Sequence, residues 1–275
     1  MNCAWKELLA VLPPRIRKDV DRFSGDIVQE IRLRLGSPVE LVCANGFRFL
    51  SGNVSAEELS FVINTASRYS PWATSSMSKG YLTAQGGHRI GICGDAVMEF
   101  GALKGFQTIR YLCIRVARDF EGISNPLGAI CDSVLILGAP GWGKTTFLRD
   151  LIRNVSKTRH ISVVDERGEL FPPGFQTGVH TDILSGCPKS IGIELVLRTM
   201  GPDYIAVDEV TSPEDCDALL DAANCGVKLA ATVHAASMQD LKRRPLYQKL
   251  LNANVFGSYV VMSREKSWKV ERIKL

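Results

Sequence analysis

The 275-residue sequence lacks several features that would assign it to a specialised class of protein. It has no uninterrupted apolar run approaching the roughly 20 residues of a membrane-spanning helix. The apolar run near its start is too short for a signal peptide and is broken by Pro13 and Pro14. Its 33 basic and 29 acidic residues leave a net charge of +4, which does not by itself predict nucleic-acid binding. We therefore expect a soluble, cytoplasmic chain that reaches any membrane through partners.

The sequence also lacks any C-x-x-C pair, although it contains eight cysteines. They are scattered along the chain, and about five lie in apolar stretches, where cysteine behaves as a small hydrophobic residue. This spacing favours reduced thiols over a disulfide framework or a zinc site. With 45% hydrophobic and 23% charged residues, the composition is that of an ordinary globular chain of one or two domains.

Residues 1–121 have the pattern of a mixed α+β domain. The segment 28–50 alternates like two or three short strands, and a capping box at Ser55 and Glu58 precedes a helical apolar face. Glycine-punctuated strands are expected at 81–84 and 89–94, before a Gly/Ser/Pro-rich boundary. The first strand places side chains on opposite sides, with Ile31, Leu33 and Leu35 on one and Glu30, Arg32 and Arg34 on the other.

Residues 122–275 alternate strand-like and helix-like segments, which predicts a parallel α/β sheet. In such sheets, ligand-binding groups collect at the carboxyl ends of the strands. The residues that follow each strand are therefore the candidates for a site. The expected strands are 134–137, 161–164, 204–207 and 228–233, and the expected helices are the segment from Lys144, 191–200 and 214–224.

The strand 134–137 runs into a phosphate-binding motif, because residues 138–145 fit G-x-x-x-x-G-K-[ST]. Glycines let successive backbone N–H groups point inward, and the helix N-terminus adds partial positive charge. We expect Lys144 to neutralise the β- and γ-phosphates and Thr145 to ligate Mg²⁺. No N-K-x-D motif for guanine occurs, which favours ATP over GTP. The expected nucleotide contacts are Gly138, Ala139, Pro140, Gly141, Trp142, Gly143, Lys144, Thr145 and Thr146.

Three other strand ends carry ionisable side chains. Asp208 and Glu209 fit the Walker B role, in which Asp208 would hold Mg²⁺ through water and Glu209 would polarise the attacking water. Asp165 and Glu166 lie between the P-loop and Walker B in sequence, which suggests an additional strand between those elements in the sheet. They could alternatively be surface acids, and Glu166 competes with Glu209 as the base. His234 could donate to the γ-phosphate or could be a structural histidine.

Hydrolysis also needs positive charge against the transition state, often an arginine supplied in cis or by a neighbouring subunit. Arg198, shortly before the Walker B strand, is the candidate in the same domain. In the first domain, Arg32 and Arg34 stand side by side as a phosphate-facing wall would require. Most surface arginines are solvated or weakly paired, so the sequence singles out none. The other candidates are Arg89, Arg110, Arg115 and Arg118.

An ordered set of segments resembles the stage III sporulation protein AA family, which is similar to the ATPases of type II and type IV secretion and pilus machines. The segments include "IRLRLGSPVEL", "GYLTAQGGHRIGICGDAV", "GAPGWGKTTFLRDLIR", "VVDERGEL", "LRTMGPDYIAVDEV" and "AATVHAAS". The resemblance covers roughly residues 25–265. It implies a RecA-like P-loop ATPase domain at 122–275 after a smaller α+β domain at 1–121. It also implies an acidic box at Asp165 and Glu166 and a histidine box at His234.

The resemblance further implies a motor subunit that hydrolyses ATP with Mg²⁺ in a homo-oligomeric, hexameric ring. Its partners would be membrane-embedded sporulation channel proteins on the mother-cell side of a channel to the forespore. An amino-terminal domain would supply arginines to the neighbouring subunit's nucleotide. This chain departs from the family at Trp142, whose bulky ring must point away from the phosphates, and around Glu209 and His234, where the flanking residues differ.

Two other functions are compatible with a P-loop. A nucleic-acid-stimulated ATPase is one, but the weak net charge and the lack of a basic run or an aromatic stacking strip argue against it, so we expect no nucleic-acid partner. A small-molecule phosphotransferase is the other. Such an enzyme would be expected to have an arginine-rich lid and a single Walker B acid, and neither is evident in this sequence.

Overall fold

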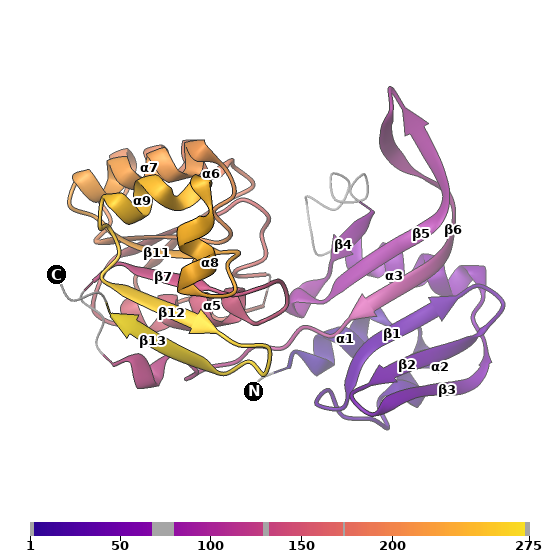
Figure 1. The fold of residues 1–275 in the computed structure, drawn as a ribbon. Helices are drawn as coiled ribbons and strands as arrows, with labels where there is room; N and C mark the ends of the chain where they lie inside the picture. Colours follow the sequence, from indigo (N-terminus) through magenta and orange to yellow (C-terminus); the bar gives the residue numbers. More distant parts are fainter. Residues whose placement is uncertain (1–2, 68–79, 129–131, 173, 273–275) are drawn as a thin grey trace. The chain divides into compact units, whose positions relative to one another are not determined.

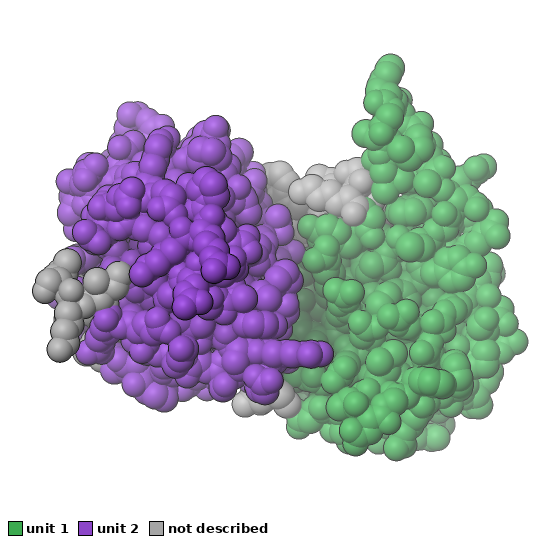
Figure 2. Space-filling view, viewed as in Figure 1, with its two compact units in different colours: residues 1–119, 172–175 green, residues 120–171, 176–275 purple. Residues whose placement is uncertain are grey.

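The computed structural model describes residues 3–67, 80–128, 132–172 and 174–272 (Figure 1). They form two compact units, coloured separately in Figure 2. Unit 1 comprises Met1–Asp119 and Pro172–Phe175, and unit 2 comprises Phe120–Phe171 and Gln176–Leu275.

Unit 1 is built on a six-stranded antiparallel sheet with the strand order β3-β2-β1-β6-β5-β4. The strands are β1 Val28–Arg34, β2 Pro38–Cys43, β3 Gly46–Asn53, β4 Tyr81–Thr83, β5 Arg89–Glu99 and β6 Ala102–Arg115. The helices are α1 Trp5–Val11, α2 Pro14–Val20 and α3 Ala56–Ser67, with a short 3₁₀ turn at Gln85–Gly87.

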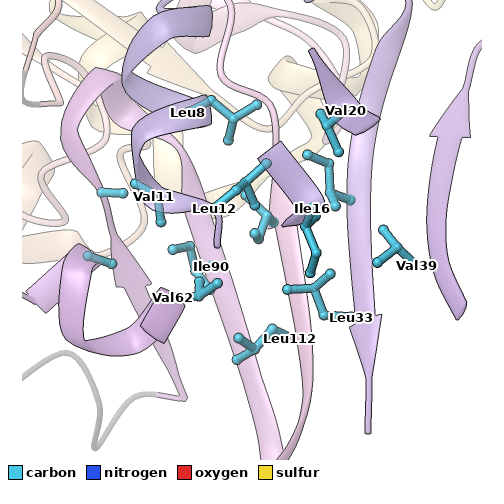
Figure 3. Packing of buried hydrophobic residues seen from close by; sticks show 14 of the residues in the cluster. Leu8, Val11, Leu12, Ile16, Val20, Leu33, Val39, Val62, Ile90 and Leu112 are labelled. Atoms are coloured by element: carbon cyan, nitrogen blue, oxygen red, sulfur yellow. The ribbon is translucent and has the colours of Figure 1, made fainter. Parts of the chain in front are cut away.

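One face of this sheet packs on the helices and forms the core of unit 1 (Figure 3). Leu12 directly after α1, Ile16 of α2 and Leu33 of β1 are each at most 1% exposed. Of the three apolar residues predicted to share one side of this strand, Ile31 and Leu33 are fully buried on β1, and Leu35 is not. Leu35 lies beyond the end of the strand and is 41% exposed, because the chain turns there.

The predicted capping box of α3 is confirmed. The backbone N–H of Glu58 donates to the Ser55 hydroxyl at 3.3 Å, and the Ser55 N–H donates to the Glu58 carboxylate at 3.0 Å. Both groups would otherwise be unpaired at the start of the helix. The Glu58 carboxylate also pairs with Arg15 of α2 at 2.8 Å, which ties the two helices together.

His88 joins distant parts of unit 1 and predicts a pH-dependent stability. Its ring is fully buried, its Nδ1 accepts from the Ala117 N–H at 3.1 Å, and its Nε2 therefore donates to the Ala4 carbonyl at 2.8 Å. Burial lowers the pKa of His88 below its ordinary value, so the ring is neutral when folded. The unfolded chain then binds the extra proton, and folding stability is lost as the pH falls.

We expect unit 1 to lose about 1 kcal/mol or more of stability below pH ~6.5, where an unfolded histidine becomes charged. Urea unfolding of the wild type and of His88→Gln at several pH values measures this effect. The glutamine variant is expected to show the weaker pH dependence across that range, and an equal dependence in both proteins would contradict the assignment.

Unit 2 contains a seven-stranded sheet with the order β13-β12-β7-β11-β10-β8-β9. Six strands are parallel, and β13 pairs antiparallel with β12. The strands are β7 Val134–Leu137, β8 Ile161–Asp165, β9 Thr181–Ser185, β10 Tyr204–Val207, β11 Lys228–Val233, β12 Ser258–Met262 and β13 Trp268–Arg272. The helices are α5 Lys144–Val155, α6 Lys189–Thr199, α7 Pro213–Asn224, α8 Met238–Arg243 and α9 Gln248–Asn252, with 3₁₀ turns at Asn125–Leu127 and Pro245–Tyr247.

Helices cover both faces of this sheet, so its central strands are apolar throughout. On β7, Leu135 and Leu137 join the core that α6 and α7 cover, while Val134 and Ile136 join the core formed with α5. All four residues are at most 1% exposed. The fold is the predicted α/β class, with a parallel sheet that follows a smaller α+β part.

The sheet order corrects one detail of the sequence interpretation. A strand does separate the P-loop strand β7 from the Walker B strand β10, but it is β11, which precedes His234. The strand of the first acidic pair, β8, lies on the far side of β10. Sequence order could not indicate this, because each parallel strand is reached by a crossover that can skip a neighbour.

Seven of the eight cysteines lie among the described residues, and all seven are free thiols. Cys131 lies outside the described residues. Within the described part of the chain, none of the helices combines the length and the apolar character needed to cross a bilayer.

Candidate nucleotide-binding site

The P-loop follows the buried strand β7 and leads directly into α5. Gly141 and Gly143 adopt left-handed backbone conformations, with φ angles of 77° and 96°, which a residue with a Cβ adopts only at a cost. Gly143 is the residue that caps α5. The first N–H groups of α5 have no acceptor within the helix, so together with the loop they can bind an anion.

Lys144 is the first residue of α5, and only 6% of it is exposed. Its ammonium donates to the Ala139 carbonyl at 3.2 Å and to Nδ1 of His234 at 3.1 Å. Burial lowers the pKa of Lys144, and the charges of Asp208 and Glu209 oppose that shift. A buried ammonium of this kind interacts strongly with any anion that enters the loop.

Asp208 lies directly after β10 and bonds to a threonine on each side. Its Oδ2 accepts from the Thr145 hydroxyl at 2.7 Å, and its Oδ1 accepts from the Thr232 hydroxyl at 2.5 Å. Thr232 also accepts from the backbone N–H of Glu209 at 2.8 Å. The P-loop, β10 and β11 are thus joined through one carboxylate.

Glu209 has an unusual backbone conformation, with a φ of 59°, which a non-glycine residue adopts only at a cost. One carboxylate oxygen bonds to Nε2 of His234, and the other pairs with Arg167 at 2.8 Å. Burial alone would raise the pKa of Glu209, but the His234 bond and the nearby cations Arg167 and Lys144 outweigh it and lower the pKa. Glu209 is therefore held as a carboxylate.

His234 connects the lysine to the glutamate. Because Lys144 donates to Nδ1, the ring is neutral with its proton on Nε2, and that proton is donated to Glu209. Lys144, His234 and Glu209 thus form a continuous chain of hydrogen bonds, which Arg167 extends at its far end.

The first acidic pair is divided between two tasks. Asp165 is 3% exposed and accepts from the N–H groups of Glu169 and Leu170 at 3.0 and 2.8 Å, so it closes the turn after β8. Burial raises the pKa of Asp165 despite these bonds. Glu166 instead pairs at 2.5 Å with Lys189, the first residue of α6. Both acids line a narrow cavity together with Asp208 and Glu209.

The structure does not bring every predicted residue into this cluster. Arg198 lies on α6 and pairs with Glu194 one turn earlier at 2.6 Å, where both side chains are more than half exposed. The six candidate arginines of unit 1 all have partners within unit 1 itself. Arg32 and Arg115 pair with Glu30, Arg34 with Glu40 and Arg110 with Asp95, while Arg118 donates to backbone carbonyls and Arg89 stacks on Tyr81.

Three residues of the cluster were missed by sequence reasoning. Thr232 lies on β11 two positions before His234, which directly follows the strand, so strand alternation could have indicated that both face the same side. Arg167 directly follows the first acidic pair. Lys189 lies 23 residues after Glu166, and nothing in the local pattern predicts their ion pair.

The residues present fit a magnesium nucleotide. Mg²⁺ takes oxygen ligands, and proteins usually hold it with one or two side chains plus phosphates and water. Thr145 and Asp208 supply such oxygens next to the loop. Among the described residues, no group of three or more His, Cys, Asp or Glu side chains is arranged to hold a metal ion.

Comparison with known proteins places this site in a family. The family model for "Sporulation stage III, protein AA" matches residues 4–273. Stage III sporulation protein AA of Bacillus subtilis (strain 168) is 36% identical over an alignment of 280 positions. The alignment covers 94% of this chain and 91% of that protein.

Solved structures share the fold. The structure of the pilus retraction motor PilT with bound ADP superimposes with a TM-score of 0.66 at 14% identity, covering 95% of this chain and 83% of that one. The ATPase DotB of Legionella pneumophila gives a TM-score of 0.55 at 18% identity, covering 94% and 79% of the two chains.

Proposed function

Since the chain belongs to the stage III sporulation protein AA family, we propose that it is an ATP-hydrolysing motor subunit of a secretion-like machine that works during sporulation. One observation carries the proposal. The ends of β7, β10 and β11 bring Lys144, the pair Asp208 and Glu209, and His234 into one hydrogen-bonded cluster beside a P-loop. The fold shared with PilT and DotB supports it.

The side chains of the cluster have complementary roles in this proposal. The loop N–H groups and Lys144 bind the β- and γ-phosphates, and Thr145 and Asp208 hold Mg²⁺, which offsets phosphate charge. Glu209 orients water and accepts its proton, since its lowered pKa keeps it ionised. Thr232 fixes the positions of the Asp208 carboxylate and the Glu209 backbone through its two hydrogen bonds.

Lys144 must leave His234 to reach a phosphate. The imidazole then loses its donor at Nδ1 while its Nε2 proton still bonds to Glu209. The orientation of Glu209, the general base, therefore depends on whether Lys144 is bound to a phosphate. This gives His234 a role in reporting the γ-phosphate to the strand that carries it.

We propose that subunits assemble into a hexameric ring on the cytoplasmic, mother-cell face of a membrane channel, with channel proteins as partners. The ring would place an arginine of one subunit against the nucleotide of the next. Within the described part of the chain, the Arg167 guanidinium contacts the cluster through Glu209. Hydrolysis would move the two units against each other.

The proposal is tested by the mass of the protein in solution, with and without Mg²⁺ and a non-hydrolysable ATP analogue. We expect a nucleotide-dependent oligomer for the wild type and none for Lys144→Ala, because the ammonium that holds the phosphates is lost. Calorimetric titration of ATP is expected to show the same loss. A strict monomer at all concentrations, or equal ATP binding by both proteins, would argue against the motor.

A further inference from the structure

A second cavity, of about 440 Å³, opens beside the P-loop. Trp142 lines it from the loop, and Met262 and Trp268 line it from β12 and β13. The turn between those strands and Ala236 complete the lining. Both indoles are half-buried and pack on the core that α5 covers. The cluster described above uses none of these side chains.

The cavity borders the phosphate loop. A Cβ placed on Gly138 would lie 3.0 Å from the Cβ of Met262, and one on Gly143 would lie 3.7 Å from its methyl group. Met262 therefore abuts both ends of the loop. The backbone N–H of Trp142 already donates to the Ala139 carbonyl at 3.2 Å, so its side chain is the part available to a ligand.

The sheet order determines which end of a bound nucleotide faces this cavity. Asp208, Glu209 and His234 follow β10 and β11, on one side of β7, so the γ-phosphate and the metal belong there. The opposite side of β7 is β12, whose end lines the cavity. Neighbouring strands lie about 4.8 Å apart, so β11 and β12 are separated by roughly 10 Å. A triphosphate whose γ-phosphate lies on the β11 side of the loop would therefore have its base directed towards β12.

We propose that this cavity binds the purine base of the nucleotide, with Trp142 and Trp268 as its aromatic walls and Met262 as its floor. The inference rests on the proposed function, because it assumes a triphosphate in the P-loop. Flat aromatic and thioether surfaces suit a base, which loses little hydration on its faces and stacks well on indole rings. The bulky residue of the loop thereby gains a role, since its ring points away from the phosphates and towards the base.

Trp268 is positioned for this contact by the core. Its ring packs edge-to-face on Phe147 of α5 with centroids 5.1 Å apart, and its Nε1 donates to the Ile123 carbonyl at 3.1 Å. The Trp142 ring makes no such hydrogen bond with the part of the chain that the structure describes, so it can be truncated with less harm to the fold. It is the better residue to test.

The experiment titrates Mg·ADP and Mg·tripolyphosphate separately into the wild type, Trp142→Ala and Trp142→Phe by calorimetry. We expect Trp142→Ala to bind ADP about ten- to a hundred-fold more weakly, as for loss of one stacked base. Binding of tripolyphosphate should not change, and Trp142→Phe should restore most of the ADP affinity. The control is Lys266→Ala, at an exposed position in the turn between β12 and β13. This variant should bind both ligands as the wild type does.

Equal weakening of both ligands by Trp142→Ala, or full retention of ADP affinity, would overturn the base-binding assignment. Trp268→Phe provides a second variant with a smaller expected loss for ADP alone, and thermal unfolding confirms that each variant is folded. If the wild type binds neither ligand, or if Lys144→Ala binds both normally, the nucleotide function itself fails. The tripolyphosphate titration thus separates the two failures.

Discussion

Replacing Glu209 with glutamine is expected to abolish ATP turnover while ATP still binds. The amide keeps the size of the side chain and can still accept from His234, but it cannot take a proton from water. Loss of a general base lowers the rate by about 10²–10⁴-fold. The phosphate-binding groups, Lys144 and the loop N–H groups, remain in place. Phosphate release after mixing with excess ATP measures the rate, and calorimetry measures the binding.

Glu166→Gln is the matched control for this prediction. Both glutamates follow an aspartate at the end of a neighbouring strand, but Glu166 pairs with Lys189, whereas Glu209 joins the chain through His234 to Lys144. We expect Glu166→Gln to retain most of the turnover. If Glu166→Gln is inactive and Glu209→Gln is active, the base lies on β8 and the roles must be exchanged.

The parts of the site that could be predicted are those that are contiguous in sequence. The strand, the glycine loop and the helix of the P-loop follow one another without interruption from Val134 to Val155, so local pattern alone specifies their geometry. The acids after β10 and the histidine after β11 follow from the rule that ligand groups collect at strand ends. The capping box of α3 is equally local.

What could not be predicted depends on pairing between distant segments. The order of β8, β10 and β11 is a property of crossovers, and no residue within a strand encodes its neighbour. The two roles of the first acidic pair likewise need the fold: Asp165 closes a turn with backbone N–H groups, and only Glu166 points to a cation. The exposed end of β1 at Leu35 depends on where the hairpin turns.

Replacing Lys189 is expected to lower the stability of unit 2 markedly, although the residue lies outside the nucleotide-binding loop. Its side chain is 7% exposed and lies between Glu166, at 2.5 Å, and Asp215, at 3.8 Å. Asp215 is itself buried and belongs to the capping box of α7, so the lysine joins the starts of α6 and α7 to the end of β8. Lys189→Met keeps the volume of the side chain but leaves both carboxylates without their cation.

We expect Lys189→Met to lower the free energy of unfolding by about 2 kcal/mol, the cost of losing a charge-assisted bond at a buried position. Arg198→Met on the same helix is the matched control, because its pair with Glu194 is exposed and should change stability by less than about 0.5 kcal/mol. Urea unfolding of both variants measures the difference. In Glu166→Gln, a further Lys189→Met change should cost less than it does alone, because part of the interaction has already gone. Equal losses for Lys189→Met and Arg198→Met would show that the buried pair does not hold these helices to the sheet.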